Sequence, residues 1–273
     1  MSTVRGLMWT IHMGNHTGFL LGSIHCMRKD MHPLPSTMEQ AFSVSSVIVF
    51  EANTAETGTP AFKRYVQAHG TYPPGDTLWN HLSPSTQQQV REALLRHQFP
   101  AHLAETIRPW LLSTILKDRS QEEDAATLHH TLGVDAYFRK KAAREGKQVR
   151  FLECATAQVD CFATLSERQQ EFLLQDAVRQ NRPEGALPLD EVLDLWSAGE
   201  ADALEAEYRQ HHQEQMTIYE HIVIHRNRRW LPMLEELLHL GQNVMIIVGG
   251  GHVGGPDGVV RLLTDKGYPL VQT

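Results

Sequence analysis

The chain has 273 residues, 41% of them hydrophobic, and a formal net charge of −7 at pH 7. This length and composition suit a globular α/β protein, and no run approaches the roughly 18 apolar residues of a membrane-spanning helix. The acidic balance, without a stripe of interleaved basic and aromatic residues, argues against nucleic acid as a partner. The three cysteines form no Cys-x-x-Cys pair and indicate neither a disulfide framework nor a zinc–thiolate site.

Two strand-like runs open the chain. Leu7 to His12 and Thr17 to Leu21 flank a Gly14-Asn15 turn, a pattern typical of a β-hairpin. The second run leads into Gly22-Ser23-Ile24-His25. Because glycine lets the backbone turn sharply where a strand ends, we expect His25 at the carboxyl edge of a sheet, where open α/β folds build their sites.

A helix and a buried strand follow. Ser36 to Glu39 has the pattern of a capping box and predicts a helix to about Ser43. Val44 to Phe50 is apolar and β-branched, which predicts a buried strand that ends at Glu51. A strand, a helix and a strand over this length form a βαβ unit, whose parallel strands end at the same edge of the sheet.

The middle of the chain is mainly helical. The apolar residues recur at helical spacing over residues 61–128, 133–144, 166–180 and 190–210. Between the second and third of these helical stretches, Lys147 to Leu152 alternates in polarity and predicts a strand that ends at Glu153.

The C-terminal part repeats the pattern of a strand followed by a histidine. Residues 215–240 look helical, although Pro232 should break or kink that helix. A strand over 243–248 then runs into Gly249-Gly250-Gly251-His252, a second Gly-x-x-His motif.

The last elements complete the expected fold. Asp257 is expected to cap a helix through about Lys266, and a final strand spans 268–271. The pattern predicts an α/β fold with a central mixed sheet, built from strands near both termini and flanked by helices. We expect a single domain over residues 1–273, with a mainly helical insertion at about 55–130 and a second helical segment at about 155–240.

Four predicted strands end at a side chain that can bind a metal or move a proton, namely His25, Glu51, Glu153 and His252. If these strands are parallel, the four side chains meet at one edge. Two imidazoles with one or two carboxylates suit Zn²⁺, Mn²⁺, Co²⁺ or Fe²⁺. We expect His25, Glu51 and His252 to bind a divalent ion that activates water, with Glu153 as general base or fourth ligand.

Backbone amides and an Arg-Asn pair are expected to bind the substrate. The glycine turns at Gly22, Gly250 and Gly251 present N–H groups that suit a carboxylate or another anion. Arg226 and Asn227 can together donate several hydrogen bonds to a carbonyl group or an oxyanion.

Taken in order, the motifs resemble the TraB/PrgY/GumN family, whose animal relatives are the Tiki proteases. The resemblance extends from about Leu7 to Val271. The stretches that carry it are Gly22 to His25, Pro33 to Pro35, Val49 to Glu51, Gly133 to Asp135, Leu152-Glu153 with Gln158, Trp196 with Gly199-Glu200, Arg226-Asn227, and Val248 to Gly255 with Gly258.

This resemblance implies a fold similar to that of the erythromycin esterases and the haem-associated ChaN proteins. It also implies a protease that depends on a divalent metal, manganese or cobalt in the Tiki proteases, and that acts on a peptide or protein. The implied active site consists of His25, Glu51 and His252.

Three functions stay open from the sequence. The first is a metal-dependent hydrolase using Mn, Co or Zn, most consistent with a peptidase. The second is a metal-independent esterase-type hydrolase in which one histidine is the base and Glu51 orients it. The third is a non-catalytic protein that binds a peptide, haem or a metal.

Oligomeric state and location have weaker signals. A homo-oligomer is compatible with the sequence. No charged and apolar leader opens the chain, which is typical of a cytoplasmic protein. A periplasmic or secreted protein whose leader has been removed is the alternative.

Overall fold

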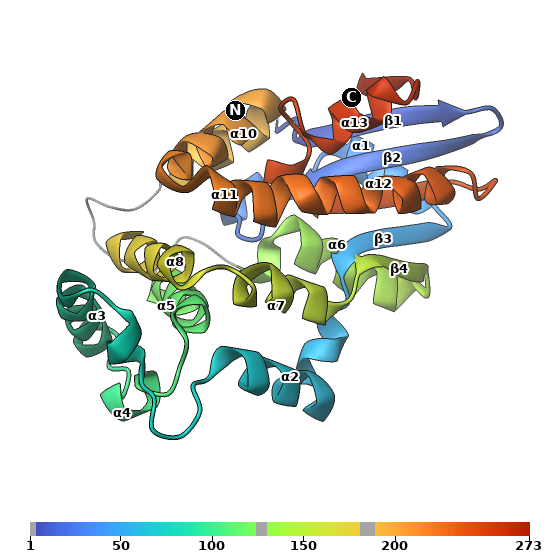
Figure 1. The fold of residues 1–273 in the computed structure, drawn as a ribbon. Coiled ribbons are helices and arrows are strands. Elements are labelled where there is room, and N and C mark those ends of the chain that lie inside the picture. Colours follow the sequence, from blue (N-terminus) through green and yellow to red (C-terminus); the bar gives the residue numbers. More distant parts are fainter. Residues whose placement is uncertain (1–3, 124–129, 181–188) are drawn as a thin grey trace. The chain divides into compact units, whose positions relative to one another are not determined.

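The computed structural model describes residues 4–123, 130–180 and 189–273 (Figure 1). The chain divides into two compact units. Of the described residues, the first unit contains 4–53, 130–153 and 189–273, and the second contains 54–123 and 154–180. Every residue predicted for the functional site belongs to the first unit.

A six-stranded mixed sheet forms the centre of the first unit, with strand order β4-β3-β5-β2-β1-β6. Strands β2, β5, β3 and β4 are parallel to one another, and β1 is antiparallel to both β2 and β6. This confirms the predicted α/β fold with strands from both ends of the chain. The strands are β1 Leu7–Met13, β2 His16–Ser23, β3 Val47–Ala52, β4 Gln148–Glu153, β5 Val244–Gly249 and β6 Leu270–Gln272.

The register of the sheet brings the ends of the four parallel strands to one edge. Ser23 at the end of β2 pairs with Gly249 at the end of β5, and Ala52 in β3 pairs with Glu153 in β4. Strand β3 begins later than predicted, because Val44 is the last residue of the preceding helix. The strand also continues one residue beyond Glu51, to Ala52, so Glu51 lies within it.

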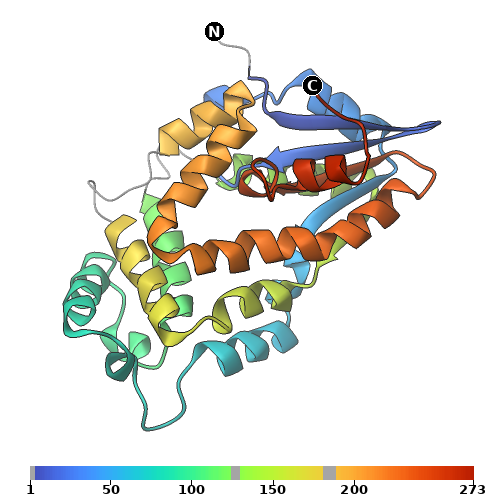
Figure 2. The same cartoon turned by 45° about the horizontal axis from the view of Figure 1, so that its top comes forward.

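Helices cover both faces of this sheet (Figures 1 and 2). Helices α1 and α6 lie on one face, and α12 and α13 on the other. The core between these layers is continuous and includes Leu21, Phe50, Phe138, Leu234 and Ile247, all fully buried. The helices of this unit are α1 Ser36–Val44, α6 Val134–Glu145, α9 Leu189–Ala198, α10 Ala201–His211, α11 Met216–Tyr219, α12 His225–Leu238 and α13 Val259–Asp265.

Two predicted helix caps are wrong. Helix α1 has Pro35 at its N-cap without a side-chain cap, and Glu39 accepts a hydrogen bond from the hydroxyl of Tyr137 at 2.5 Å. Helix α13 has Gly258 at its N-cap, while the carboxylate of Asp257 pairs with Arg228. In both cases the acidic side chain that was predicted to cap the helix binds a residue that is distant in sequence instead.

The break predicted at Pro232 does not occur. Helix α12 continues through it from His225 to Leu238. Pro232 and Arg228, whose carbonyl loses its helical donor, both lie on the exposed face. Water can solvate that carbonyl, so the buried face of the helix carries Arg226 and Trp230 without interruption.

The second unit is built from helices around its own small core, which includes Leu78, Val90, Leu112 and Leu174. Among the residues that the structure describes, no helix is both long enough and apolar enough to cross a membrane. The helices of this unit are α2 Pro60–Gly70, α3 Pro84–Arg96, α4 Ala101–Ala104, α5 Pro109–Glu123, α7 Ala155–Ala163 and α8 Glu167–Gln180. The end of the helical stretch predicted over 61–128 lies outside the described residues.

Short helical turns complete the two units. They are η1 Lys29–Met31, η2 Thr54–Gly58, η3 Leu78–His81, η4 His130–Leu132, η5 Gln213–Gln215, the π-helical turn η6 Glu220–Ile224, and η7 Gly250–His252.

Candidate functional site

The side chain of Arg226 lies at the centre of the predicted site. It reaches from the buried face of α12 to the ends of β3 and β4 and to the turn after β5. It donates to Glu51 Oε2 at 2.7 Å, to Glu153 Oε1 at 2.6 Å and to His252 Nε2 at 3.0 Å. We call these four residues, Glu51, Glu153, Arg226 and His252, the strand-edge cluster.

Every N–H group of the Arg226 guanidinium has a partner. Besides the three bonds above, Nε donates to Glu153 Oε2 at 3.3 Å, and Nη1 donates to the carbonyl of Ile222 in the π-helical turn at 3.1 Å. A guanidinium has five N–H donors, so none is left over. Burial disfavours its charge, but the carboxylates of Glu51 and Glu153 outweigh burial and raise the pKa of Arg226 above its ordinary value.

Glu51 is held by backbone as well as by side chains. Its Oε1 accepts the N–H of Gly249 at 2.5 Å, across neighbouring strands. Burial favours the neutral acid, but His252, Arg226 and the Gly249 N–H together lower the pKa of Glu51 to about 2. The carboxylate is therefore ionised throughout the physiological range.

The tautomer of His252 follows from its neighbour Asn227. The Nδ2 group of Asn227 donates to the carbonyls of His252 and Asp257 at 3.2 and 2.9 Å, so its Oδ1 must face the imidazole. His252 Nδ1 lies 2.7 Å from that oxygen and carries the proton. The lone pair is then on Nε2, where Arg226 donates.

His252 is neutral at physiological pH. Its side chain is buried against the ring of Trp230, with ring centroids 4.7 Å apart. Burial is the main cause that lowers the pKa of His252 to about 4. The negative charge of Glu51 opposes this shift, and the positive charges of Arg226 and His25 add to it. Trp230 also donates from Nε1 to Glu153 at 3.1 Å, so one ring supports two members of the cluster.

His25 differs from His252 in exposure and charge. Its side chain is 77% exposed, and Nδ1 lies 3.3 Å from Oδ2 of Asp135, at the start of α6. The neighbouring carboxylate of Asp135 is the main cause that raises the pKa of His25 to about 9, and the charge of Glu51 adds to it. His25 is therefore a cation at neutral pH.

The Gly133-Val134-Asp135 stretch docks directly on the backbone of the first Gly-x-x-His motif. Val134 N–H donates to the carbonyl of Ile24 at 3.0 Å. A Cβ at Gly133 would lie 2.0 Å from the carbonyl oxygen of His25, so only glycine fits this approach. Asp135 is a site residue that sequence reasoning did not assign. Its signal is the Gly-Val-Asp stretch, which by itself predicts no more than the start of a helix.

The three glycines predicted to bind substrate have close packing neighbours. A Cβ at Gly22 would meet Leu7 at 3.0 Å, one at Gly250 would meet Leu204 at 2.9 Å, and one at Gly251 would meet the ring of Tyr208 at 2.9 Å. Tight packing is enough to account for glycine at these positions. Their role in substrate binding stays a prediction.

The predicted metal ligands do not form a metal site in this arrangement. Among the described residues, no group of three or more His, Cys, Asp or Glu side chains is placed to hold an ion. The lone pairs that Glu51 and His252 would offer to a metal accept hydrogen bonds from Arg226 instead. Within the same residues, His25 pairs with Asp135 and has no hydrogen bond to Glu51 or His252.

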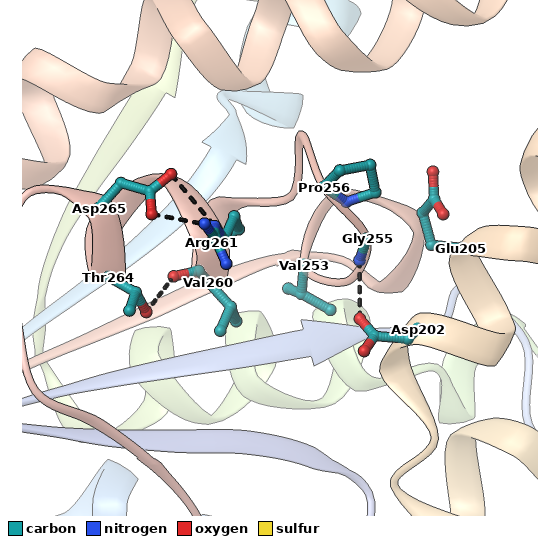
Figure 3. Close-up of a pocket in the computed structure, with 9 residues that line it drawn as sticks. All are labelled: Asp202, Glu205, Val253, Gly255, Pro256, Val260, Arg261, Thr264 and Asp265. Atoms are coloured by element: carbon teal, nitrogen blue, oxygen red, sulfur yellow. Dashed lines mark hydrogen bonds and ion pairs between the residues drawn. The ribbon is translucent and has the colours of Figure 1, made fainter.

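A separate open pocket of about 760 Å³ begins beside the cluster, at the residue after His252 (Figure 3). Asp202 accepts the backbone N–H of Gly255 there at 2.8 Å, and Arg261 pairs with Asp265. None of the predicted site residues lines it. The lining residues are Asp202, Glu205, Val253, Gly255, Pro256, Val260, Arg261, Thr264 and Asp265.

Comparison with known proteins agrees with the order of motifs. The family model described as the TraB/PrgY/gumN family matches residues 7–272, nearly the whole chain. No curated protein matches the chain, and no solved structure matches it.

Proposed function

The chain belongs to the TraB/PrgY/gumN family, and on that premise we propose that it is a hydrolase. The proposed active site is the strand-edge cluster together with His25. The observation that carries the proposal is the convergence of two imidazoles and two carboxylates at the ends of four parallel strands. The proposed substrate is a peptide amide bond, as the family resemblance implies.

The two histidines supply the proposed acid and base. His25, with its pKa raised to about 9, carries a proton at neutral pH, while His252, with its pKa lowered to about 4, is neutral. Environments that push two pKa values apart are typical of acid and base pairs in active sites. His25 is therefore assigned as the proton donor and His252 as the acceptor.

In the proposed reaction, only the N–H bond from Arg226 to His252 Nε2 opens, and a water takes its place there, while the bonds of Arg226 to Glu51, Glu153 and Ile222 stay in place. His252 takes a proton from this water, whose oxygen attacks the carbonyl carbon. The bond to the leaving nitrogen then breaks as His25 donates its proton to that nitrogen. The products are a carboxylic acid and an amine. His252 releases its proton to solvent and His25 takes one up from solvent, which restores both starting states.

Glu51 and Asn227 support these two roles. Asp135 is the main group that raises the pKa of His25, and the negative charge of Glu51 adds to this effect on the donor. Asn227 fixes the proton of His252 on Nδ1 and leaves Nε2 as the basic atom. The proposed reaction uses no metal ion, because Arg226 donates to the oxygen of Glu51 and the nitrogen of His252 that would face one.

A kinetic comparison of variants tests the proposal. Purified protein is assayed on a library of fluorogenic peptide amides and on activated esters, with and without chelator. We expect His25→Ala and Glu51→Gln each to lower kcat/KM by about 10²–10⁴-fold. His102→Ala, an exposed histidine of the second unit, is the matched control and should leave kcat/KM unchanged.

Three outcomes would count against the proposal in different ways. Turnover that survives both His25→Ala and Glu51→Gln would remove the active site from this edge. Activity that chelator abolishes and Mn²⁺ or Co²⁺ restores would favour a metal-dependent peptidase over acid–base catalysis by the two histidines. Preference for esters over amides would favour the esterase-type alternative.

A further inference from the structure

We propose that the guanidinium of Arg226 takes the place of a divalent cation in this protein. Arg226 and a metal ion then exclude one another at Glu51, Glu153 and His252. This inference concerns binding and does not rest on the proposed hydrolysis, because its readout is the presence of an ion at the cluster.

The atoms that face Arg226 are those that a divalent metal ion would need. Two carboxylates and one neutral imidazole nitrogen are the ligand set that Zn²⁺, Mn²⁺ or Co²⁺ would need. In this structure the same oxygens and nitrogen accept N–H bonds at 2.7, 2.6 and 3.0 Å. A metal could bind them only if the guanidinium left.

Arg226 cannot leave its two carboxylate partners at low cost. All five of its N–H groups are bonded, its pair with Glu153 is bidentate, and its guanidinium carbon lies 4.7 Å from the centre of the Trp230 ring. The carbonyl of Ile222 in the π-helical turn accepts a further hydrogen bond from Nη1 at 3.1 Å. Displacing this group would leave a buried cation without partners.

The charges of the strand-edge cluster also disfavour a metal ion beside Arg226. Glu51 and Glu153 carry two negative charges, Arg226 carries one positive charge, and His252 is neutral. The side chains of Arg226 and Glu153 are 10% and 7% exposed, so water screens little between them. A divalent ion placed beside the guanidinium would add like-charge repulsion in a poorly screened site, whereas one that replaced it would be favourable.

The test compares wild-type protein with Arg226→Met, which removes the charge and keeps an apolar side chain of similar length. Arg228→Met is the matched control, because Arg228 lies on the same helix, is 61% exposed and pairs only with Asp257 in the described structure. Each protein is titrated with Co²⁺ and followed by visible ligand-field absorption, and with Mn²⁺ and Zn²⁺ by calorimetry.

We expect wild type and Arg228→Met to show no ion bound at the cluster. Arg226→Met should gain one bound equivalent, with an affinity at least about tenfold above any site of wild type, because two carboxylates and an imidazole lose their cation. Adding Glu51→Gln to Arg226→Met should abolish the gained site. Arg226→Lys, which keeps a positive charge, should not gain it.

Wild-type protein alone can overturn the proposal, even if Arg226→Met does not fold. One equivalent of metal bound to wild type and lost in both Glu51→Gln and His252→Ala would show that an ion enters despite Arg226. Metal that binds wild type and is retained in both variants binds other histidines among the sixteen of the chain, which supports exclusion from the cluster.

Discussion

The two Gly-x-x-His motifs share a sequence pattern and a position after a strand, but their histidines differ in charge. Each follows a parallel strand, and each presents its histidine at the same edge of the sheet. His25 is exposed and paired with Asp135, which makes it a cation, whereas His252 is buried against Trp230 and neutral. A sequence motif can therefore place an imidazole, while its tertiary neighbours decide its charge.

The neighbours differ in kind on the two sides. On the side of His25 the dominant group is a single carboxylate, brought by the start of α6. On the side of His252 burial is the main cause of the neutral state, and the group that donates to the ring is Arg226, which Glu51 and Glu153 hold in place. These different neighbours make His25 the acid and His252 the base of the proposed reaction. Substitutions that change the neighbours of one histidine at a time therefore test the two assignments separately.

The largest effect is expected from removing Arg226. Arg226→Met leaves the ionised carboxylates of Glu51 and Glu153 buried without their cation, so we expect the free energy of unfolding to fall by about 3–5 kcal/mol. Chemical denaturation at pH 7 measures it. Arg228→Met, at an exposed ion pair, should cost no more than ~1 kcal/mol. If the two variants lose the same free energy of unfolding, Arg226 stabilises the fold no more than an exposed ion pair does.

The pH dependence of stability should separate the two histidines. The raised pKa of His25 stabilises the fold below pH 6.5, and this contribution is lost as pH rises through about 9. The lowered pKa of His252 has the opposite sign, so stability is lost as pH falls from 6.5 through about 4. These two contributions together give a maximum near pH 6.5. For buried His252 the acid-side loss is ~3 kcal/mol.

Denaturation curves between pH 4 and 9 check this expectation. His252→Gln should flatten the acid side of the profile alone, and His25→Gln the alkaline side alone, so each variant is the control for the other. Protonation of Glu51 adds to the acid-side loss in both variants, but only below pH 4.5. If both variants change the same side of the profile, the opposite charge states are wrong.

The smallest expected effect is on one pKa value. Asp135→Asn removes the carboxylate that holds the proton of His25, so the pKa of His25 should fall from about 9 towards 6.5. The pKa of His252 should stay near 4, since Asp135 is not among its perturbing groups. NMR titration of the imidazole C–H signals measures both values, with the exposed Asp30→Asn as control.

The same substitution tests whether Asp135 acts through His25. If His25 is the proton donor, the alkaline limb of kcat/KM should move to lower pH in Asp135→Asn while the acid limb stays in place. A uniform loss of activity at every pH would point to a structural role for Asp135. An unchanged profile would remove His25 as the donor.

Much of the fold could be predicted because its signals are local. The apolar runs before His25 and His252 indicated buried strands, and the glycines after them indicated where each strand ends. These patterns depend on backbone freedom and on side-chain burial within a few residues. The errors at Glu39 and Asp257 arose where a tertiary partner outweighed a local helix cap.

The site could be predicted only in part. Its membership was largely apparent, because Glu51, Glu153 and His252 each follow or end a strand of the parallel set. The role of Arg226 was not, since nothing near it in sequence indicates that its five N–H groups are all bonded. Asp135 was overlooked because its partner belongs to another element of the fold.

Sequence alone determined which chemical groups stand at the carboxyl edge of the sheet, because strand formation and chain reversal obey short-range physics. Tertiary structure decided the charge states and the hydrogen-bond partners of these groups. Arg226 binds Glu51, which is 175 residues away in the sequence, and His252, which is 26 residues away. Charge states and hydrogen-bond partners depend on distances of a few ångströms between such remote groups. Only the folded chain brings them that close.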